Sequence, residues 1–219
     1  MQTNSEENYL KGIYHLSRQN TGKVRIKSIS EILGNNPASV VEMLKKLMDK
    51  KLIQYDKSKG AKLTDKGLKT ALFIVRKHRL WEVFLQEKLG YKWDEIHDIA
   101  EQLEHIKDAD LVERLDKFLG FPEYDPHGDP IPNSNGKLPN AVKTLLLEVE
   151  IGKSCKVAAV KDTTVVFLRY LQKLSVHIGT KIKVIDKIVF DGSMEIQIGK
   201  DAKTIVSRMF AESLLVDEL

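Results

Sequence analysis

The chain has 219 residues, of which 42% are hydrophobic and 30% are charged, a composition that excludes a disordered chain and a membrane protein. Its length favours two or three small domains. The single cysteine, Cys155, cannot form an internal disulfide, and the polar N-terminus lacks the features of a signal peptide, so we expect a cytoplasmic protein.

Positive charge is concentrated in the first third of the chain. Residues 1–75 carry 14 Lys and Arg against 7 Asp and Glu, whereas the remaining residues carry 21 against 24. A basic segment joined to a mildly acidic remainder is typical of a nucleic-acid-binding domain attached to a body that does not bind nucleic acid. A solvated, lysine-rich surface would produce the same charge pattern.

The first predicted helices carry the pattern of a helix-turn-helix. Apolar residues over 9–16 form a helical stripe that Asn20-Thr21-Gly22 terminates. Residues 27–33 fit a short second helix. Asn36 followed by Pro37 is the start signal of a longer third helix, because it places an N-cap side chain before a proline at the first helical position.

A β-hairpin is predicted directly after the third helix. Residues 52–55 and 61–63 have the composition of short strands, and the segment between them, 56–60, is polar and contains glycine. A helix-turn-helix followed by such a hairpin indicates a winged helix. We expect this DNA-binding domain to cover residues 1–72.

Helices are predicted again after the hairpin. Thr64-Asp65 begins a long helix, and further helices are expected over 94–105 and 108–119. These helices are apolar on one side and have little protein around them, so we expect the partner subunit of a homodimer to cover them. Together with the Pro- and Gly-rich segment 120–139, they make a helical metal-binding and dimerisation domain over residues 73–140.

The remaining residues, 141–219, predict a small β-barrel. Short strands are expected over residues 155–160, 181–185 and 193–198. One helix is expected between the first two strands, over residues 164–174. Residues 202–219 carry weaker signals, with a turn near Ala211-Glu212 and a final strand. The predicted fold class is therefore mainly α with a small β component.

Histidines and carboxylates recur at helical spacing in the second predicted domain. Four of them share one face of the predicted helix over 94–105, namely His97, Glu101, Glu104 and His105. On the preceding helix, His78 and Glu82 are four residues apart and could face the same space. Mixed His and carboxylate ligands suit divalent manganese, iron, cobalt or zinc. A solvated charged helix face would explain the pattern without a metal.

Four motifs give the chain a resemblance to the diphtheria toxin repressor family, which includes iron-dependent repressors and manganese transport regulators. They are Glu7-Asn8-Tyr9-Leu10-Lys11-Gly12-Ile13-Tyr14, Arg76-Lys77-His78-Arg79-Leu80-Trp81-Glu82, the run from His97 to His105, and Pro126-His127-Gly128-Asp129-Pro130-Ile131-Pro132. The resemblance covers nearly the whole length. It implies an N-terminal winged helix-turn-helix, a helical dimerisation domain and a C-terminal SH3-like domain of the iron-transport protein A type.

The resemblance also implies a function. Such a protein is a transcriptional repressor that binds palindromic operator DNA as a homodimer when it is loaded with Mn(II) or Fe(II), with Zn(II) or Co(II) able to bind in vitro. Its targets would be genes for metal-ion uptake. The metal would fix the DNA-binding head against the body and so set the separation of the two recognition helices.

Ligand sets follow from the same resemblance. One site is implied at Glu101, Glu104 and His105, with Asn8 from the first helix. A second, ancillary site is implied at His78, Glu82 and His97. Asp162 of the SH3-like segment is implied as its fourth ligand. Glu101 is the choice of the manganese regulators where iron-responsive members carry cysteine. Asn8 replaces the usual methionine or aspartate, and Lys11 stands where one manganese-regulator branch has glutamate.

Contacts with DNA are predicted on the third helix, the second helix and the wing. The N-terminal part of a recognition helix enters the major groove, so the base-facing residues are expected to be Pro37, Ala38, Ser39 and Glu42. Phosphate contacts are expected from Lys27, Ser28, Lys45, Lys46, Lys57 and Lys59.

Two other functions stay open at this point. A winged-helix regulator that responds to an organic ligand would bind DNA without any dependence on metal. A metal-dependent hydrolase would turn over a substrate, but no nucleophile–base pair is evident beside the predicted ligands, so we expect no enzyme.

Overall fold

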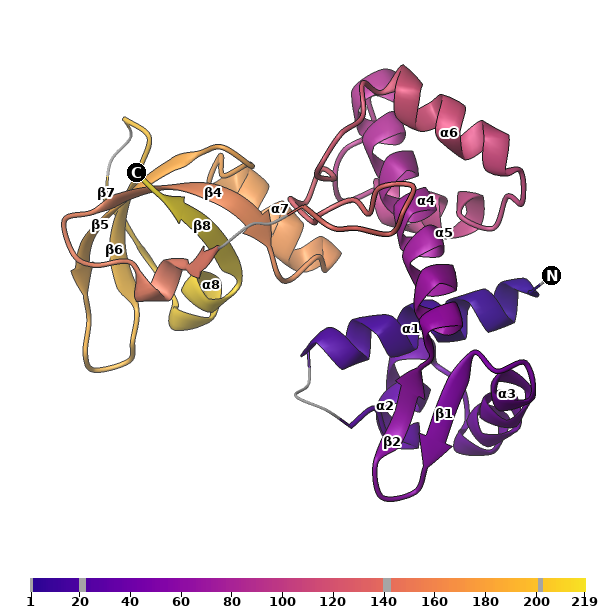
Figure 1. The fold of residues 1–219 in the computed structure, drawn as a ribbon. Coiled ribbons are helices and arrows are strands. Elements are labelled where there is room, and N and C mark those ends of the chain that lie inside the picture. Colours follow the sequence, from indigo (N-terminus) through magenta and orange to yellow (C-terminus); the bar gives the residue numbers. More distant parts are fainter. Residues whose placement is uncertain (1, 20–22, 140–142, 201–202) are drawn as a thin grey trace. The chain divides into compact units, whose positions relative to one another are not determined.

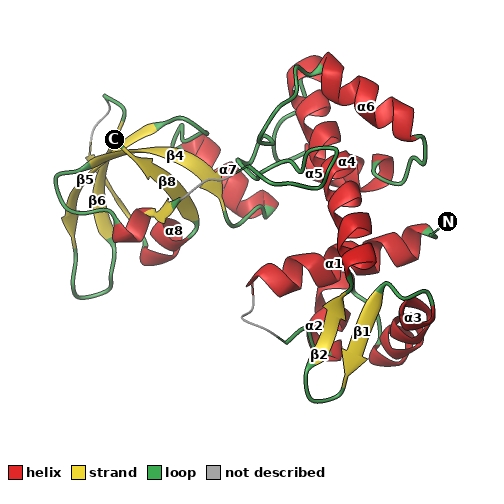
Figure 2. Ribbon diagram, viewed as in Figure 1, coloured by secondary structure: helices red, strands yellow, loops and turns green. Residues whose placement is uncertain are grey.

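The computed structural model describes residues 2–19, 23–139, 143–200 and 203–219 (Figures 1 and 2). Its backbone contacts divide the chain into two compact units. The first unit comprises residues 1–78, 101–115 and 132–137, and the second comprises 79–100, 116–131 and 138–219. No helix in the described part of the chain combines the length and the apolar character that crossing a bilayer requires.

The predicted winged helix is confirmed in the first unit. It contains α1 (Asn4–Gln19), α2 (Ile26–Leu33), α3 (Pro37–Asp49) and the antiparallel hairpin of β1 (Ile53–Asp56) and β2 (Gly60–Leu63). Asn36 caps α3 as predicted, because its Oδ1 accepts a hydrogen bond from the Ser39 N–H at 2.9 Å. The predicted terminator Asn20-Thr21-Gly22 lies outside the described residues.

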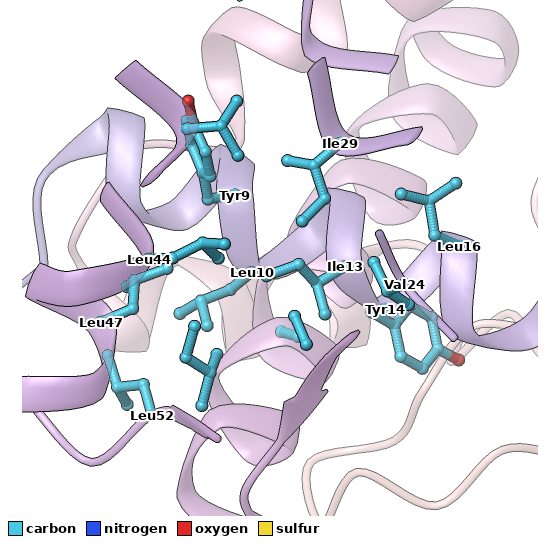
Figure 3. Packing of buried hydrophobic residues seen from close by; sticks show 14 of the residues in the cluster. Tyr9, Leu10, Ile13, Tyr14, Leu16, Val24, Ile29, Leu44, Leu47 and Leu52 are labelled. Carbon is cyan, nitrogen blue, oxygen red and sulfur yellow. The ribbon is translucent and has the colours of Figure 1, made fainter. Parts of the chain in front are cut away.

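The core of the winged helix forms around the apolar face of α1 (Figure 3). Leu10 and Ile13 are fully buried and face Ile29 of α2 and Leu44 of α3. Leu52, at the base of the wing, closes the same cluster. Burial of each such side chain contributes about 1.5–3 kcal/mol, so the amphipathic stripes read from the sequence explain this core.

Three helices follow the wing: α4 (Asp65–Leu89), α5 (Ile96–Leu103) and α6 (Ala109–Phe118). The prediction of one helix over 94–105 was wrong at both ends. Glu104 and His105 lie in a turn after α5, where the Ile106 N–H donates to the Leu103 carbonyl at 3.1 Å. The side chains of Glu104 and His105 bind groups of α1, and these contacts replace the helical geometry that the sequence pattern suggested.

The described residues between α6 and the β-domain, 119–139 and 143, contain no helix, as predicted. Residues 125–129 form a tight loop in which the Asp125 N–H donates to the Asp129 carbonyl at 2.9 Å, and the Gly128 N–H donates to the Asp125 carbonyl at 3.0 Å. A bridge between Tyr124 and Pro130 closes the base of this loop.

The C-terminal part is a six-stranded antiparallel sheet with the strand order β3-β8-β4-β5-β6-β7. Its elements are β3 (Thr144–Leu145), the 3-10 helix η1 (Leu146–Glu148), β4 (Ser154–Val160), α7 (Val165–Lys173), β5 (Lys181–Lys187), β6 (Met194–Ile198), β7 (Lys203–Val206), α8 (Arg208–Glu212) and β8 (Leu214–Glu218). The three predicted strands and α7 are present. The sequence did not predict β3, β7 or α8, because each is short and carries little periodic pattern.

Candidate metal centres and nucleic-acid interface

Three buried ligand-type side chains meet where α4 passes the loop 125–129. They are Glu82 of α4, with Asp125 and His127 of the loop, and one ligand atom of each lies within 4.8 Å of the other two. All three belong to the second unit. They are 2–7% exposed, and buried carboxylates of this kind need a cation or a proton to balance their charge.

The imidazole of His127 is held in one orientation. Its Nε2 lies 3.0 Å from the Trp93 carbonyl, to which it donates, and the Trp93 ring stacks on it at 6.1 Å. The other ring nitrogen, Nδ1, lies 3.8 Å from Glu82 Oε2. A histidine that donates one N–H to a backbone carbonyl presents its second nitrogen as a ligand, and this is the usual arrangement at metal centres in proteins.

Asp125 organises the loop as well as facing Glu82. Its Oδ1 accepts hydrogen bonds from the backbone N–H groups of His127 at 2.8 Å and Asp129 at 3.0 Å. Its Oδ2 lies 3.4 Å from Nε of Arg79, and Arg79 also contacts the Asp129 carboxylate at 3.3 Å and donates to the Pro130 carbonyl. The loop therefore folds around the Arg79 guanidinium.

The electrostatics of this cluster favour a bound cation. Burial, together with the carboxylates of Glu82 and Asp129, raises the pKa of Asp125 to about 7, although Arg79 opposes the shift. Burial alone would lower the pKa of His127, but Glu82, Asp125 and the Trp93 carbonyl raise it to about 9. Protons thus balance the clustered carboxylates, and divalent cations bind such groups by displacing those protons.

One of the predicted ancillary ligands, His97, lies next to this cluster, and another, Asp162, comes two residues after a strand end that is bonded to the loop. Nδ1 of His97, whose side chain is 51% exposed, is 3.4 Å from Glu82 Oε1. Asp162 follows β4, and its Oδ1 accepts from the Thr164 N–H at 2.9 Å. The end of β4 is tied to the loop, because the Val160 N–H donates to the His127 carbonyl at 2.9 Å.

A second polar cluster lies in the first unit and joins α1 to the end of α5. Glu104 is completely buried, and His78 Nδ1 lies 2.7 Å from its Oε2. Nζ of Lys11 lies 2.7 Å from Glu104 and 2.5 Å from Glu101 Oε1. Burial would raise the pKa of Glu104, but the hydrogen bond from His78 and the charge of Lys11 hold it below its usual range.

The other predicted ligands of this cluster have different neighbours. His105 Nδ1 lies 2.7 Å from Glu7 Oε2 of α1. Asn8 is half-buried, and its Oδ1 is a buried oxygen with no hydrogen-bond partner among the described residues. Buried acceptors normally have a partner, so this oxygen is suited to a bound cation or a water molecule. In the structure His78 therefore lies beside Glu104, and Glu82 lies beside His97.

Sequence reasoning did not assign roles to four residues that the structure brings into these clusters, namely Glu7, Lys11, Asp125 and His127. His127 lies in the motif Pro126–Pro132, and a histidine in a loop rich in proline and glycine could have been taken as a ligand. Nothing local connects Asp125 to Glu82, which is far away in the sequence.

The predicted DNA contacts are accessible in the first unit. The residues named for bases and phosphates are exposed, except for the half-buried Ser28. Asp56 orders the tip of the wing, because its Oδ1 accepts from the N–H groups of Ser58 at 2.8 Å and Lys59 at 2.9 Å. A basic wing beside an exposed helix N-terminus is suited to phosphate and base contacts, respectively.

Three family models match successive parts of the chain. Residues 1–61 match the iron-dependent repressor N-terminal DNA-binding domain, and residues 64–133 match the iron-dependent repressor metal-binding and dimerisation domain. Residues 144–218 match the FeoA domain. These matches confirm the expected fold class, with a DNA-binding domain, a helical dimerisation domain and an SH3-like sheet domain.

Individual proteins that are similar to this chain are also metal-dependent repressors. The iron-dependent repressor IdeR of Mycobacterium bovis is 33% identical over 126 residues, which are 58% of this chain and 54% of the relative, so the chain spans about half of that protein's length. Among solved structures, a manganese-dependent transcriptional repressor in complex with manganese is 34% identical, with a TM-score of 0.88 over 98% of this chain and 100% of that one. ScaR with bound Cd²⁺ is 34% identical, with a TM-score of 0.81 over 98% and 99% of the two chains.

Proposed function

The chain belongs to the family of iron-dependent repressors, and on that premise we propose that it represses transcription by binding palindromic operator DNA as a homodimer when it holds Mn(II) or Fe(II). Zn(II) or Co(II) would bind in vitro. The genes that it controls would be those for metal-ion uptake, and the protein would act in the cytoplasm, where the DNA is.

One observation carries the metal dependence. Glu82, Asp125 and His127 form a buried group of two carboxylates and one imidazole, and His127 is already oriented by its bond to the Trp93 carbonyl. Such oxygen and nitrogen donors suit divalent first-row metals. We propose Asp162 as a further ligand, because it follows the strand end that is bonded to His127. The bound metal would supply a fixed positive charge that holds these segments together.

The remaining predicted ligands supply the second part of the proposal. His97 lies beside Glu82 and would complete or shield that centre. Glu101, Glu104 and His105, with Asn8 and the adjacent His78, would form a second cation site that links α1 to the end of α5. The hydrogen bonds of Lys11 and Glu7 tie these carboxylates and imidazoles to α1. In this way a cation signal would reach the winged helix.

DNA binding would use the exposed start of α3 in the major groove. Pro37, Ala38, Ser39 and Glu42 are proposed to face bases. The phosphate contacts would come from the second helix, the end of the recognition helix and the wing, through Lys27, Ser28, Lys45, Lys46, Lys57 and Lys59. A homodimer presents two such helices by a two-fold axis, so its operator should be a palindrome with half-sites about 34 Å, or a multiple of that distance, apart.

The dimer surface is proposed at the C-terminal ends of α4 and α6. Leu89 is 57% exposed, Phe118 65% and Phe121 63%, and all three lie in the segment that matches the dimerisation domain. Phe118 packs beside Phe84 with ring centroids 6.3 Å apart. Grouped apolar side chains of this size are typical of a surface that another subunit covers.

Fluorescence anisotropy with a labelled palindromic duplex from the gene's own neighbourhood tests the proposal. Wild type should bind weakly in chelator and tightly with Mn²⁺ or Fe²⁺, and Glu82→Gln should lose that response. Glu150→Gln is the control, because Glu150 is an exposed glutamate of the C-terminal sheet domain, outside the proposed metal sites and the proposed dimer surface. Equal binding by wild type in chelator and in each metal would contradict metal control and favour a regulator that responds to an organic ligand.

Sedimentation tests the dimer separately. Phe118→Asp should shift the protein to a monomer and weaken operator binding, whereas Phe190→Asp, at a phenylalanine that is 98% exposed between β5 and β6, should leave the dimer intact. A dimeric Phe118→Asp variant would exclude this surface.

A further inference from the structure

The carboxylates of Glu101 and Glu104 already hold a cation that belongs to the chain. Nζ of Lys11 lies 2.5 Å from one and 2.7 Å from the other. The side chain of Lys11 is 11% exposed and that of Glu104 is 0% exposed, so this pair is enclosed, whereas the side chain of Glu101 is 34% exposed. Lys11 comes from α1, Glu101 from α5 and Glu104 from the turn after α5, which makes the contact a bridge between segments distant in the sequence.

A divalent ion at this site would need the place that the ammonium occupies. First-row divalent ions lie about 2.0–2.2 Å from carboxylate oxygens. An ion bound to the same carboxylate oxygens would compete with the ammonium for them. The ammonium and the metal therefore disfavour each other, because both are cations and both need the same two carboxylates.

We propose that Lys11 is a tethered competitor that occupies the cation site of Glu101 and Glu104 and sets the ion concentration at which it fills. This inference rests on the proposed function, since it concerns the second of the two proposed cation sites. Metal binding there requires the Lys11 side chain to leave its two carboxylates. The centre at Glu82, Asp125 and His127 would fill first, and the Lys11 site only at higher ion concentration.

Two observations support this order of filling. Asn8, on the same helix as Lys11, offers a neutral oxygen and adds no negative charge to attract a metal. His105 is compatible with a metal at this site, because its Nδ1 contacts Glu7 at 2.7 Å while its Nε2 lies 3.9 Å from Glu104 Oε1. At the other centre the cation is Arg79, whose contacts with Asp125 at 3.4 Å and Asp129 at 3.3 Å are longer than those of Lys11 with its two carboxylates.

The size of the effect follows from population arithmetic. If the ammonium leaves the site for about one-tenth of the time or less, the apparent dissociation constant of the metal rises about tenfold or more. Removing the ammonium should recover that factor. The divalent ion would then neutralise both glutamates without a competitor.

Calorimetric titration of the metal-free full chain with Mn²⁺ alone tests this inference. Wild type should show one tight and one weaker binding event, and Lys11→Gln should leave the tight event unchanged and strengthen the weaker one by about tenfold or more. Lys50→Gln is the matched control. Nζ of Lys50 lies 2.6 Å from Glu6, which is on α1 like Lys11, and this pair lies outside both sites. It should change neither event.

An unchanged or weaker second event in folded Lys11→Gln would overturn the inference while the first event still supports the proposed function. Absence of both events from wild type and variant would overturn both. If Lys11→Gln does not fold, two further measurements test whether the Lys11 ammonium competes with the metal. Lys11→Arg, which keeps a cation, should bind the second ion as weakly as wild type. The ammonium NMR signal of Lys11 in wild type should shift only when Zn²⁺ fills the second site, and a signal unaffected by saturating Zn²⁺ would refute displacement.

Discussion

Replacing Gly128 with alanine tests how the loop 125–129 positions the proposed metal centre. Gly128 has φ +82°, and a Cβ built on it would lie 2.1 Å from the Ala158 carbonyl oxygen of β4. Carbon–oxygen contacts normally begin at about 3.3 Å, so the loop and the strand must separate by about 1 Å. The left-handed backbone adds about 1–2 kcal/mol of strain for any residue with a side chain.

The loop cannot make this adjustment freely. Lys143 Nζ lies 2.5 Å from the Gly128 carbonyl and 3.2 Å from that of Ala158, and the Val160 N–H holds the His127 carbonyl at 2.9 Å. Metal–ligand distances tolerate about 0.2 Å. A shift of about 1 Å should therefore reduce Mn²⁺ affinity by about 10–100-fold, as the loss of groups that orient ligands does elsewhere.

Gly90→Ala is the control that separates the effect of backbone strain from the effect of moving the loop 125–129. Gly90 has φ +73°, and, apart from its neighbours in the chain, no heavy atom of the described residues lies within 4 Å of the position that a Cβ would take there, so alanine has the same backbone strain without a clash. Both variants should lose stability in urea unfolding, but only Gly128→Ala should lose Mn²⁺ affinity in calorimetry. If both variants bind Mn²⁺ equally well, the position of the loop does not control the metal centre and the reasoning fails.

Three further predictions follow from single contacts. Lys45→Glu should weaken operator binding and reduce the slope of log affinity against log salt by about 1–2, and an unchanged slope would remove Lys45 from the phosphate contacts. Burial, with a smaller effect of Glu218, raises the pKa of the Cys155 thiol to about 11, so native protein should not react with a disulfide reagent at pH 8, whereas unfolded protein should; rapid reaction of native protein would contradict this. Burial would raise the pKa of Glu6, but Lys50 holds it below its ordinary value. The pair therefore stabilises the fold at pH values above the ordinary pKa, and this contribution is lost as the pH falls through the lowered pKa. The free energies of unfolding of Lys50→Gln and wild type should converge in acid and differ at neutral pH, and a difference that does not change with pH would refute the pairing.

The local elements of the winged helix could be predicted from the sequence because their signals are local. Asn36 and Pro37 mark the start of α3, and the observed helix begins at Pro37 with the Asn36 side chain on the Ser39 N–H. The apolar stripe of α1 predicted the buried face that holds Leu10 and Ile13. Capping and amphipathic spacing depend on residues three or four positions apart, so one stretch of chain contains all the information.

The candidate sites were only partly predictable. The pattern His97, Glu101, Glu104 and His105 identified the segment that carries ligand-type residues, yet it assumed a helix that in the structure ends at Leu103. The resemblance implied Glu82 as a ligand, but it did not place Asp125 or His127 beside it.

Local sequence patterns were enough to predict the winged helix, the helical segment, the β-domain and the residue types available to hold a cation. Packing between distant segments set the end of α5 before Glu104, the place of Lys11 between Glu101 and Glu104, and the contact of the loop 125–129 with Glu82. The contacts of Lys11 and of the loop join residues more than 40 positions apart. Their geometry depends on how whole elements pack, and periodicity along one element does not contain that information.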